Sequence, residues 1–450
     1  MSRPLLALPL VLLAALAISA CSPDTPPLGP STPPATETAK VHTDTFRLKA
    51  YDLDSVHLAG SLNSWNEQDP AWELTMQGDG TTWLLVKEVP DVIHTYKYVI
   101  RKGADEAWLT DPDAKDILPD GFHGSPSYWN VVKGRSFPTP DPLPTPIPRN
   151  EMVIYEISLN DFSASGTFAG AQANLTQNAD LADLGVNVIE LLPVTAPSYN
   201  GWGYDPVLQA APNGAFGWPS SFANLVDAAH DLGMAVILDA VVNHMAGSAP
   251  LRQLDDFTGT YRFTTTESNP WGLVELNWSD PLLKEHILES LSHWVTAYNV
   301  DGFRFDYIGG EPYTTWSWLR NNLLARHPDL ILIAEDFGYP ANSITYGYDA
   351  QWGAQHTDQW GGGGNNFCQV LATTLSQNGF ASRGTTDIQT GAWGIPYNNM
   401  WAMANVIGPN SNYAGAATGD GFSDVKYLES HDENRVVWYV NNVGSPEAQA

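Results

Sequence analysis

The prediction of the fold rests on one stretch of the chain, Val300-Asp301-Gly302-Phe303-Arg304-Phe305-Asp306. With the two-residue period of a strand, Arg304 and Asp306 lie on one side, and Phe303 and Phe305 lie on the other, where covering helices can bury them. An Arg–Asp pair is expensive to bury for stability alone. A carboxylate held beside a guanidinium stays ionised and aimed, as a nucleophile requires. The alternative interpretation is a structural ion pair at the end of a strand.

The composition limits the class of protein. The 450 residues are enough for two or three domains, and a hydrophobic content of 43% supports a large core. The formal net charge of −29 argues against nucleic acid and against anionic membrane surfaces as partners, and it suits a neutral substrate. The 17 Trp and 18 Tyr residues supply flat, amphipathic rings for the core and for stacking surfaces.

The N-terminus has the pattern of a targeting segment. Arg3 precedes an apolar run at residues 5–17, which is too short for a comfortable permanent membrane span. The run leads into Ile18-Ser19-Ala20-Cys21, which resembles the bacterial lipobox. The resemblance implies that residues 1–20 are a lipoprotein signal peptide and that a lipid on Cys21 anchors the exported protein in a bacterial membrane, at the outer membrane or cell surface. An ordinary cleaved signal with a chance Cys is the alternative.

Composition shifts divide the chain that follows. Residues 21–42 are rich in Pro, Ser and Thr and predict an extended tether, and residues 136–149 predict a stiff Pro-rich linker. Between them, residues 43–135 contain short alternating runs such as Thr95-Tyr96-Lys97-Tyr98-Val99-Ile100, separated by turn clusters such as Gly78-Asp79-Gly80. This spacing predicts a small, immunoglobulin-like β-sandwich.

Three segments of this β-region carry a resemblance. They are Leu58-Ala59-Gly60-Ser61-Leu62-Asn63-Ser64-Trp65-Asn66, Tyr96-Lys97-Tyr98 and Trp108-Leu109-Thr110-Asp111-Pro112. Together they are similar to the starch- and glycogen-binding modules that precede branching and debranching enzymes. The resemblance implies that exposed Trp rings stack against sugars. The alternative interpretation makes Trp65, Trp83 and Trp108 core residues.

Residues 150–450 have the pattern of strands that alternate with helices. Apolar, β-rich runs predict the strands, and helical spacing of apolar residues predicts the helices. Asp280-Pro281 is a good helix start, because Asp can cap a helix and Pro suits its first turn. The alternation predicts a parallel sheet. The predicted strands are residues 152–159, 186–192, 235–239, 300–306, 330–334 and 424–428, and the predicted helices are residues 175–184, 222–232 and 281–298.

Polar residues at strand ends favour a closed (β/α)8 TIM barrel over an open, doubly wound α/β sheet. In a barrel the carboxyl ends of all strands converge on one face, where catalytic groups from separate strands meet. An open sheet spreads these ends apart, and the sequence contains no Gly-rich phosphate loop that would indicate a nucleotide. The side chains at these ends are Asp239, Asn243, His244, Asp306, Glu335, His431 and Asp432.

Three acids at separate strand ends predict glycoside chemistry. A retaining mechanism uses an ionised nucleophile and a protonated acid/base about 5–5.5 Å apart. Asp306, beside Arg304, suits the nucleophile. Glu335, behind an apolar strand, suits the acid/base because desolvation raises the pKa of a carboxyl. Asp432 suits stabilisation of the positive charge that develops on the sugar ring.

Two histidines and an asparagine complete the predicted set. His244 and His431 suit hydrogen bonds to hydroxyls of the same sugar ring. Because His, Asp and Glu also bind metals, a metal site is the competing use of these groups. The sequence contains no His-x-x-x-His pattern and no Cys pair, so a catalytic transition metal is not expected, and no cofactor is required for the chemistry. Asn243 is the candidate ligand for a structural Ca²⁺.

Four segments follow one another along the barrel region. They are Asp239-Ala240-Val241-Val242-Asn243-His244, Gly302-Phe303-Arg304-Phe305-Asp306, the strand ending at Glu335, and Ser430-His431-Asp432. Their order and approximate spacing resemble the four motifs of the α-amylase superfamily, glycoside hydrolase family 13. The resemblance implies a TIM barrel, with Asp306 as nucleophile, Glu335 as acid/base and Asp432 as transition-state stabiliser.

The same resemblance implies the groups that bind the substrate. It places Asp239, His244, Arg304 and His431 around the scissile sugar, and Tyr204 of Trp202-Gly203-Tyr204-Asp205-Pro206 beneath it. The alternative for Tyr204 is an aromatic side chain that packs on the barrel rim. Within the superfamily, Leu276-Asn277-Trp278 and Val188-Ile189-Glu190-Leu191-Leu192-Pro193-Val194 look closer to branching, debranching and trehalohydrolase enzymes than to typical α-amylases.

The chain departs from the family pattern in three places. Ser430 stands where the fourth motif usually has Asn. Tyr307-Ile308-Gly309-Gly310 follows Asp306 without the Lys-His pair that many amylases use on the leaving-group side. The sequence stops 18 residues after Asp432, so the last barrel strand and the usual C-terminal β-domain are expected to be missing, either because this is a fragment or because the protein is truncated.

These observations predict an exported, lipid-anchored glycoside hydrolase that cleaves α-glucosidic bonds in starch, glycogen or maltodextrin by a retaining two-carboxylate mechanism. Export favours hydrolysis, because glycogen synthesis inside the cell needs no signal peptide. The expected partners are an α-glucan and, through the anchor, a membrane. A branching-type transglycosylase and a catalytically inactive glucan-binding lipoprotein are the alternatives.

Overall fold

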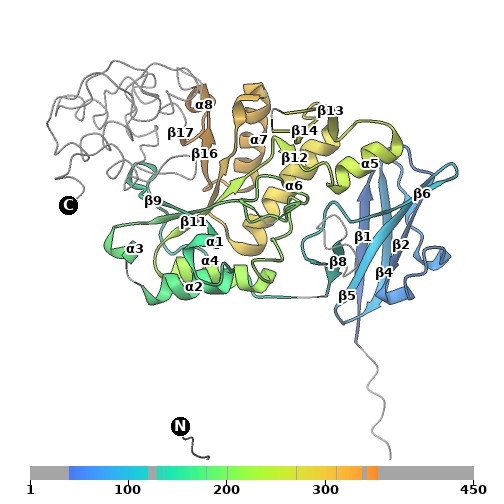
Figure 1. The fold of residues 1–450 in the computed structure, drawn as a ribbon, viewed down its shortest axis with the longest axis horizontal. Helices are drawn as coiled ribbons and strands as arrows, with labels where there is room; N and C mark the ends of the chain where they lie inside the picture. Colours follow the sequence, from blue (N-terminus) through green and yellow to red (C-terminus); the bar gives the residue numbers. More distant parts are fainter. Residues whose placement is uncertain are drawn as a thin grey trace, which may run out of the picture. The chain divides into compact units, whose positions relative to one another are not determined.

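The computed structural model describes residues 40–119, 129–134, 136–178, 180–199, 201–269, 271–310, 312–336 and 342–352 (Figure 1). The predicted strand at residues 424–428 lies outside these residues, as do Cys21, His431 and Asp432. No helix in the described part of the chain combines the length and the apolar character needed to cross a membrane.

The first described region, residues 41–133, contains two antiparallel sheets. Its alternating runs form strands as predicted, and the immunoglobulin-like class remains a prediction. One sheet has the order β1-β4-β3 and the other β2-β5-β8-β7, with β6 also paired to β5. The strands are β1 Val41–Lys49, β2 Ser55–Gly60, β3 Thr75–Met76, β4 Thr82–Pro90, β5 His94–Lys102, β6 Asp105–Leu109, β7 Ile117–Pro119 and β8 Trp129–Lys133, with short helices η1 Ser61–Asn63 and η2 Pro70–Trp72.

The second region is built on one parallel sheet whose strand order follows the chain order. A doubly wound sheet reverses its order at a switch point. The described strands contain no such reversal, which fits the predicted barrel. They are β9 Ile154–Ile157, β10 Val188–Leu191, β11 Ala235–Ala240, β15 Gly302–Phe305, β16 Ile331–Glu335 and β17 Ala350–Trp352.

Helices and a small antiparallel sheet, β12-β14-β13, lie between these strands (Figure 1). The small sheet follows β11 and precedes the longest helix. The helices are α1 Leu159–Phe162, α2 Phe168–Gln177, α3 Asp180–Asp183, α4 Pro219–Asp231, α5 Pro250–Thr258, α6 Pro281–Tyr298, α7 Tyr313–Arg326, α8 Asn342–Thr345, η4 Arg149–Glu151 and η5 Ile308–Gly310; the small strands are β12 His244–Met245, β13 Thr264–Ser268 and β14 Val274–Leu276.

The predicted start of α6 is confirmed. The carboxylate of Asp280 accepts from the backbone N–H groups of Leu282 and Leu283, and Pro281 occupies the first turn. The apolar face that the helical spacing predicted is buried against the core.

The predicted helix at residues 175–184 is wrong in its bounds. The structure has α2 at residues 168–177 and the separate turn α3 at residues 180–183. Thr167 caps α2 by accepting from the N–H of Gly170. The buried face of α2 begins at Phe168, so the apolar period starts seven residues before the predicted helix.

The strand β15, which carries Arg304, has the two faces that the sequence predicts. Phe303 and Phe305 are fully buried, and the ring of Phe305 lies 6.3 Å from that of Trp316 on α7. Gly302 is required by close packing between strands, because a Cβ atom there would lie 2.1 Å from the carbonyl oxygen of Ile331. Arg304 lies on the opposite face of the strand and is also fully buried.

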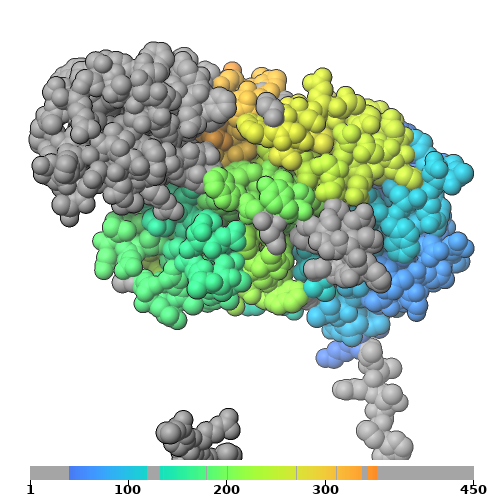
Figure 2. Space-filling model, in the orientation of Figure 1, coloured from blue at the N-terminus to red at the C-terminus, as the bar shows by residue number. Residues whose placement is uncertain are grey.

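The β-region packs against α5 and α6 of the barrel region through polar contacts (Figure 2). Arg47 binds Glu289 on α6 at 2.7 Å, and Nδ1 of His286 on α6 lies 2.8 Å from Asp113. The Pro-rich segment also contacts the barrel, since the ring of Phe137 stacks on Tyr298 with centroids 5.0 Å apart. Residues 136–149 therefore lie along the barrel region.

Candidate active site

Arg304 is the centre of the candidate site. Its Nη1 donates to Oδ1 of Asp239 at 2.8 Å and to Oδ1 of Asp306 at 2.9 Å, and its Nη2 lies 2.9 Å from Oε2 of Glu335. The three carboxylates come from the ends of β11, β15 and β16, which are adjacent in the sheet. One guanidinium therefore gathers three predicted site residues, and these acids hold its pKa well above the ordinary value although burial opposes this.

Asp306 follows β15 and is held from two sides. Besides the contact with Arg304, its Oδ2 accepts from Nδ2 of Asn243 at 2.9 Å, and Asn243 also donates to the backbone carbonyl of Asp306 at 2.8 Å. Both donors suit a carboxylate, and together they fix its orientation. Such an aimed carboxylate is what a nucleophile requires.

Glu335 ends β16 and is buried. The pKa of its carboxyl is raised to about 8, because burial and the negative charge of Asp306 outweigh the opposing effect of Arg304. A carboxyl with this pKa retains its proton at neutral pH and can act as a general acid. Glu335 and Asp306 thus contact the same guanidinium but have different hydrogen-bond partners.

Tyr204 and His244 lie beside the cluster. The hydroxyl of Tyr204 donates to Oδ2 of Asp239 at 2.6 Å, and the pKa of Tyr204 is well above its usual value because of burial and the charge of Asp239. Nε2 of His244 donates to the backbone carbonyl of Tyr204 at 2.7 Å, and Nδ1 contacts Oδ1 of Asn243. The structure brings Tyr204, Asp239, Asn243, His244, Arg304, Asp306 and Glu335 together, whereas His431 and Asp432 lie outside the described residues.

The surroundings of Asn243 do not fit a calcium ligand. A calcium site needs oxygen atoms that are free to coordinate, but Oδ1 of Asn243 faces His244 and its Nδ2 faces Asp306. Within the part of the chain that the structure describes, no group of three or more His, Cys, Asp or Glu side chains could hold a metal ion. Asn243 orients the nucleophile candidate instead.

Two aromatic residues near the site were not predicted as functional. Tyr307 directly follows Asp306, and its backbone N–H donates to Oε2 of Glu335 at 2.7 Å. Trp271, in the turn between β13 and β14, is 56% exposed, and its ring meets that of Tyr307 at 87° with centroids 5.3 Å apart. The sequence could have indicated Tyr307 by its position directly after the nucleophile candidate Asp306. No feature of the neighbouring sequence distinguishes Trp271 from the other Trp residues.

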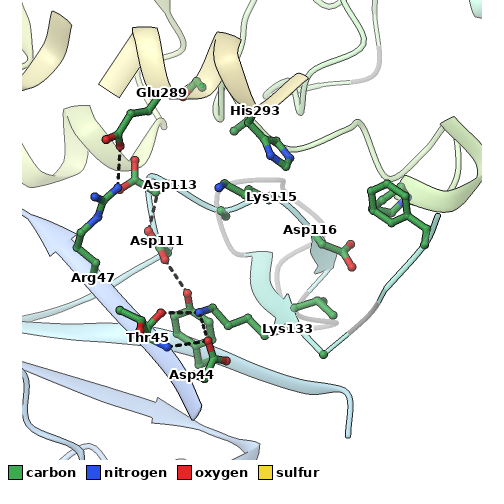
Figure 3. A pocket seen from close by; sticks show the side chains of 18 of the residues that line it. Asp44, Thr45, Arg47, Asp111, Asp113, Lys115, Asp116, Lys133, Glu289 and His293 are labelled. Carbon is green, nitrogen blue, oxygen red and sulfur yellow. Dashed lines mark hydrogen bonds and ion pairs between the residues drawn. The ribbon is translucent and has the colours of Figure 1, made fainter. Parts of the chain in front are cut away.

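A cavity of about 460 Å³ lies away from this cluster, between the β-region and α6 (Figure 3). Its charged side chains largely pair with one another. Arg47 binds Glu289, Lys133 binds Asp44 at 2.8 Å, and the hydroxyl of Tyr96 donates to Asp111 at 2.6 Å. The Arg47–Glu289 pair joins the β-region to α6, and the other two pairs lie within the β-region. None of the residues clustered around Arg304 lines this cavity.

Comparison with known proteins finds a family that part of the barrel region resembles. Residues 153–271 match the family described as "Alpha amylase, catalytic domain". This segment contains Tyr204, Asp239, Asn243 and His244 of the candidate site. This part of the barrel region is therefore similar to the catalytic domain of the α-amylase family.

Two relatives show how much of the chain is shared. The malto-oligosyltrehalose trehalohydrolase of Saccharolobus solfataricus is 32% identical over 269 residues, which cover 57% of this chain and 45% of the relative. The 1,4-alpha-glucan branching enzyme GlgB of Bacillus caldolyticus is 27% identical over 317 residues, which cover 65% of this chain and 44% of the relative. The chain thus spans less than half the length of these curated relatives.

A solved structure shares the fold. The pullulanase from Anoxybacillus sp. LM18-11, crystallised with maltotetraose, matches with a TM-score of 0.66 and 20% identity, covering 90% of this chain and 62% of the pullulanase chain. At this identity the likeness shows the fold alone. The six sequential parallel strands fit the α-amylase type of (β/α)8 barrel.

Proposed function

We propose that the protein is a retaining glycosidase that acts on α-glucans, with Asp306 as nucleophile and Glu335 as acid/base. The observation that carries this proposal is the shared guanidinium of Arg304, which contacts both carboxyls, combined with the pKa of about 8 at Glu335. The α-amylase-family match supports the same chemistry.

The two carboxyl groups act in two successive chemical steps. Asp306 attacks the anomeric carbon while Glu335 donates its proton to the glycosidic oxygen, so the bond to the leaving sugar breaks and a covalent glycosyl-enzyme forms. Glu335, now a carboxylate, then takes a proton from a water molecule whose oxygen displaces Asp306 from the anomeric carbon. In this proposal Arg304 and Asn243 keep Asp306 aimed, and Asp432 stabilises the charged ring.

The substrate class is inferred from the relatives. The names of the similar proteins are those of a trehalohydrolase, a branching enzyme and a pullulanase, and these act on glucose polymers or oligomers. We propose hydrolysis of starch, glycogen or maltodextrin as the main activity. A branching-type transglycosylase differs only in the second step, where a sugar hydroxyl replaces water.

The β-region contributes a second, glucan-binding function in this proposal. Trp65 and Trp108 are exposed by 36% and 43%, and their rings stack with centroids 6.3 Å apart and an interplanar angle of 27°. Trp83, by contrast, is buried. A paired, exposed indole surface suits the apolar face of a sugar ring, so Trp65 and Trp108 are the proposed stacking residues.

Lipid anchoring of the exported chain through Cys21 remains a proposal from the sequence pattern alone. Growth of an expressing bacterium with a labelled fatty acid is expected to label the wild-type chain and not the Cys21→Ser variant. Equal labelling of both chains would contradict lipidation at this residue.

Product analysis tests the activity. The full chain is incubated with amylose, pullulan and glycogen, and new reducing ends and new branch points are measured. New reducing ends that disappear in the Asp306→Asn variant are expected, because this variant removes the nucleophile while leaving the side-chain volume unchanged. New branch points without new reducing ends would show that the protein is a transglycosylase and not a hydrolase. Undiminished activity in the variant would overturn the site assignment.

A further inference from the structure

Two donors converge on a single oxygen of Glu335. The backbone N–H of Tyr307 donates to Oε2 at 2.7 Å, and Nη2 of Arg304 lies 2.9 Å from the same atom. Among the described residues, Oε1 has no hydrogen-bond partner, although the residue as a whole is 5% exposed. The two oxygens of this carboxyl are therefore not equivalent.

The donor from Tyr307 depends on an unusual backbone conformation. Tyr307 has a φ of +38°, in the left-handed region that non-glycine residues rarely adopt. Such a conformation persists only where the surrounding structure holds it. The strain lies directly after Asp306, and its consequence is an N–H group that points at the acid/base of the neighbouring strand.

The ring of Tyr307 is held from the side. It meets Trp271 edge-to-face, with centroids 5.3 Å apart. The turn that carries Trp271 is fixed by Asn269, whose Oδ1 accepts from the N–H groups of Trp271 and Leu273. Edge-to-face aromatic pairs are favourable, so this turn supports the left-handed conformation of Tyr307 through its ring.

We propose that Tyr307 is a positioning residue that determines which oxygen of Glu335 carries the transferable proton. Oε2 accepts from the Tyr307 N–H and lies against the Arg304 guanidinium, so a hydrogen on that oxygen would face a donor and a positive charge. The proton is consequently held on Oε1, the oxygen left open. This inference rests on the proposed function, because it deepens the role of Glu335 as the acid/base.

The charged groups around Glu335 are consistent with a proton on Oε1 and a negative charge on Oε2. Arg304 and the Tyr307 N–H favour the ionised carboxylate, whereas Asp306 and Asp239 favour the protonated form, as does burial. When Oε1 gives its proton to the leaving oxygen, the negative charge on Oε2 is met by both donors at once. In the second step the open Oε1 accepts the proton of the attacking water.

Substitutions at position 307 distinguish the effect of the backbone conformation from the effect of the aromatic ring. Tyr307→Gly allows the left-handed backbone and keeps the N–H, but removes the ring. Tyr307→Val also removes the ring, and its β-branched side chain opposes the left-handed conformation. Tyr307→Phe keeps the ring and is the matched control. Only Tyr307→Val is expected to turn the N–H away from Glu335.

The expected result is a difference in pH profile. Loss of the Tyr307 donor removes a contact that favours the ionised form, so the basic limb of kcat/KM is expected to move up by about one pH unit in Tyr307→Val, with kcat lower by about 10-fold. Tyr307→Phe and Tyr307→Gly are expected to keep the limb of the wild type. An unmoved limb in Tyr307→Val, or an equal shift in Tyr307→Gly, would overturn the proposal.

A measurement without substrate separates this inference from the proposed function. Carbon-13 NMR follows the Glu335 carboxyl, identified by its loss in Glu335→Gln, and its titration midpoint is expected to rise in Tyr307→Val but not in Tyr307→Phe or Tyr307→Gly. If the wild type shows no activity on glucans but this shift is seen, the proposed function fails and the positioning role stands. If Tyr307→Val does not fold, Trp271→Ala weakens the same support, and an unchanged Glu335 midpoint in that variant would contradict the proposal.

Discussion

Two buried carboxyl groups with raised pKa values, Glu335 and Asp111, occupy different regions and serve different purposes. Burial and, next, the charge of the neighbouring Asp113 raise the pKa of Asp111 in the β-region to about 6. Yet Oδ2 of Asp111 accepts from the hydroxyls of Tyr96 and Tyr98, and its Oδ1 accepts from the N–H of Asp113. In Glu335 the Tyr307 N–H and the Arg304 guanidinium both meet Oε2, and among the described residues Oε1 has no hydrogen-bond donor.

The difference shows that a raised pKa by itself does not define a catalytic acid. Both groups keep their protons to a higher pH than a free carboxyl, for the same physical reason of desolvation. Only Glu335 combines this with an oxygen free of protein donors and with a second carboxylate on the same guanidinium. The neighbourhood of Asp111 is a structural junction, and that of Glu335 is a site.

The largest expected effect is at Arg304. Arg304→Met leaves the buried carboxyl groups of Asp239, Asp306 and Glu335 without the cation that they share. Removal of one partner of a buried ion pair destabilises a protein by about 3–5 kcal/mol, and activity on glucans is expected to be lost. Urea unfolding followed by circular dichroism measures the change. A loss below about 1 kcal/mol would show that the cluster does not depend on this charge.

The next largest effect is expected at Glu335, where a substitution lowers activity and changes stability little. Glu335→Gln removes the transferable proton and is expected to lower kcat by about 10²–10⁴-fold, the usual contribution of general acid–base catalysis. Asp111→Asn is the matched control, with activity expected to stay within about 2-fold. Initial rates on a soluble maltodextrin measure both. A comparable loss in Asp111→Asn would remove the distinction between junction and site.

The two carboxyls also predict different pH windows for stability. A raised folded-state pKa means that the native state binds more protons, so stability falls as pH rises toward that pKa. For Glu335 the window runs from its ordinary value of 4.5 to about 8, and for Asp111 from 3.8 to about 6. As pH rises from 6 to 8, the Tm of Glu335→Gln is expected to fall less than the Tm of the wild type. The Tm of Asp111→Asn is expected to fall as much as that of the wild type. Thermal unfolding at several pH values tests this, and parallel curves for all three chains would contradict it.

The smallest effect is expected at the junction. The side chain of Arg47 is 38% exposed, and that of its partner Glu289 is 33% exposed, so solvent screens the pair. Arg47→Met is expected to lower the free energy of unfolding by less than about 1 kcal/mol and to leave activity unchanged. Denaturant unfolding and initial rates measure this. A loss as large as that in Arg304→Met would show that the two ion-pair sites are energetically alike.

Much of the fold could be predicted because its signals are local. The alternation in residues 300–306 predicts a strand with Arg304 on one face and two Phe residues on the other, and the structure has this arrangement. Asp280 and Pro281 marked the start of α6. The helix predicted at residues 175–184 was misplaced, because the apolar period of α2 was recognised only at its last turn.

The candidate site was predictable as a set of residues and not as a set of contacts. Strand ends that follow one another in a parallel sheet indicated that Asp239, Asp306 and Glu335 would meet. The role of Asn243 was missed, since its bond to Asp306 spans 63 residues of chain and depends on the loop after β11. His431 and Asp432 remain predictions.

The sequence by itself determined the strand and helix pattern, the order of the acidic residues along it and the resemblance of the barrel region to the α-amylase family. These follow from the period of apolar residues and from caps, both of which act over a few neighbouring residues. Only the tertiary structure decided that Arg304 serves three carboxylates, that Tyr307 adopts a left-handed conformation, and that its N–H and Arg304 meet the same oxygen of Glu335. The physical reason is that hydrogen-bond partners are set by strand register and loop packing, which bring together atoms from distant parts of the chain.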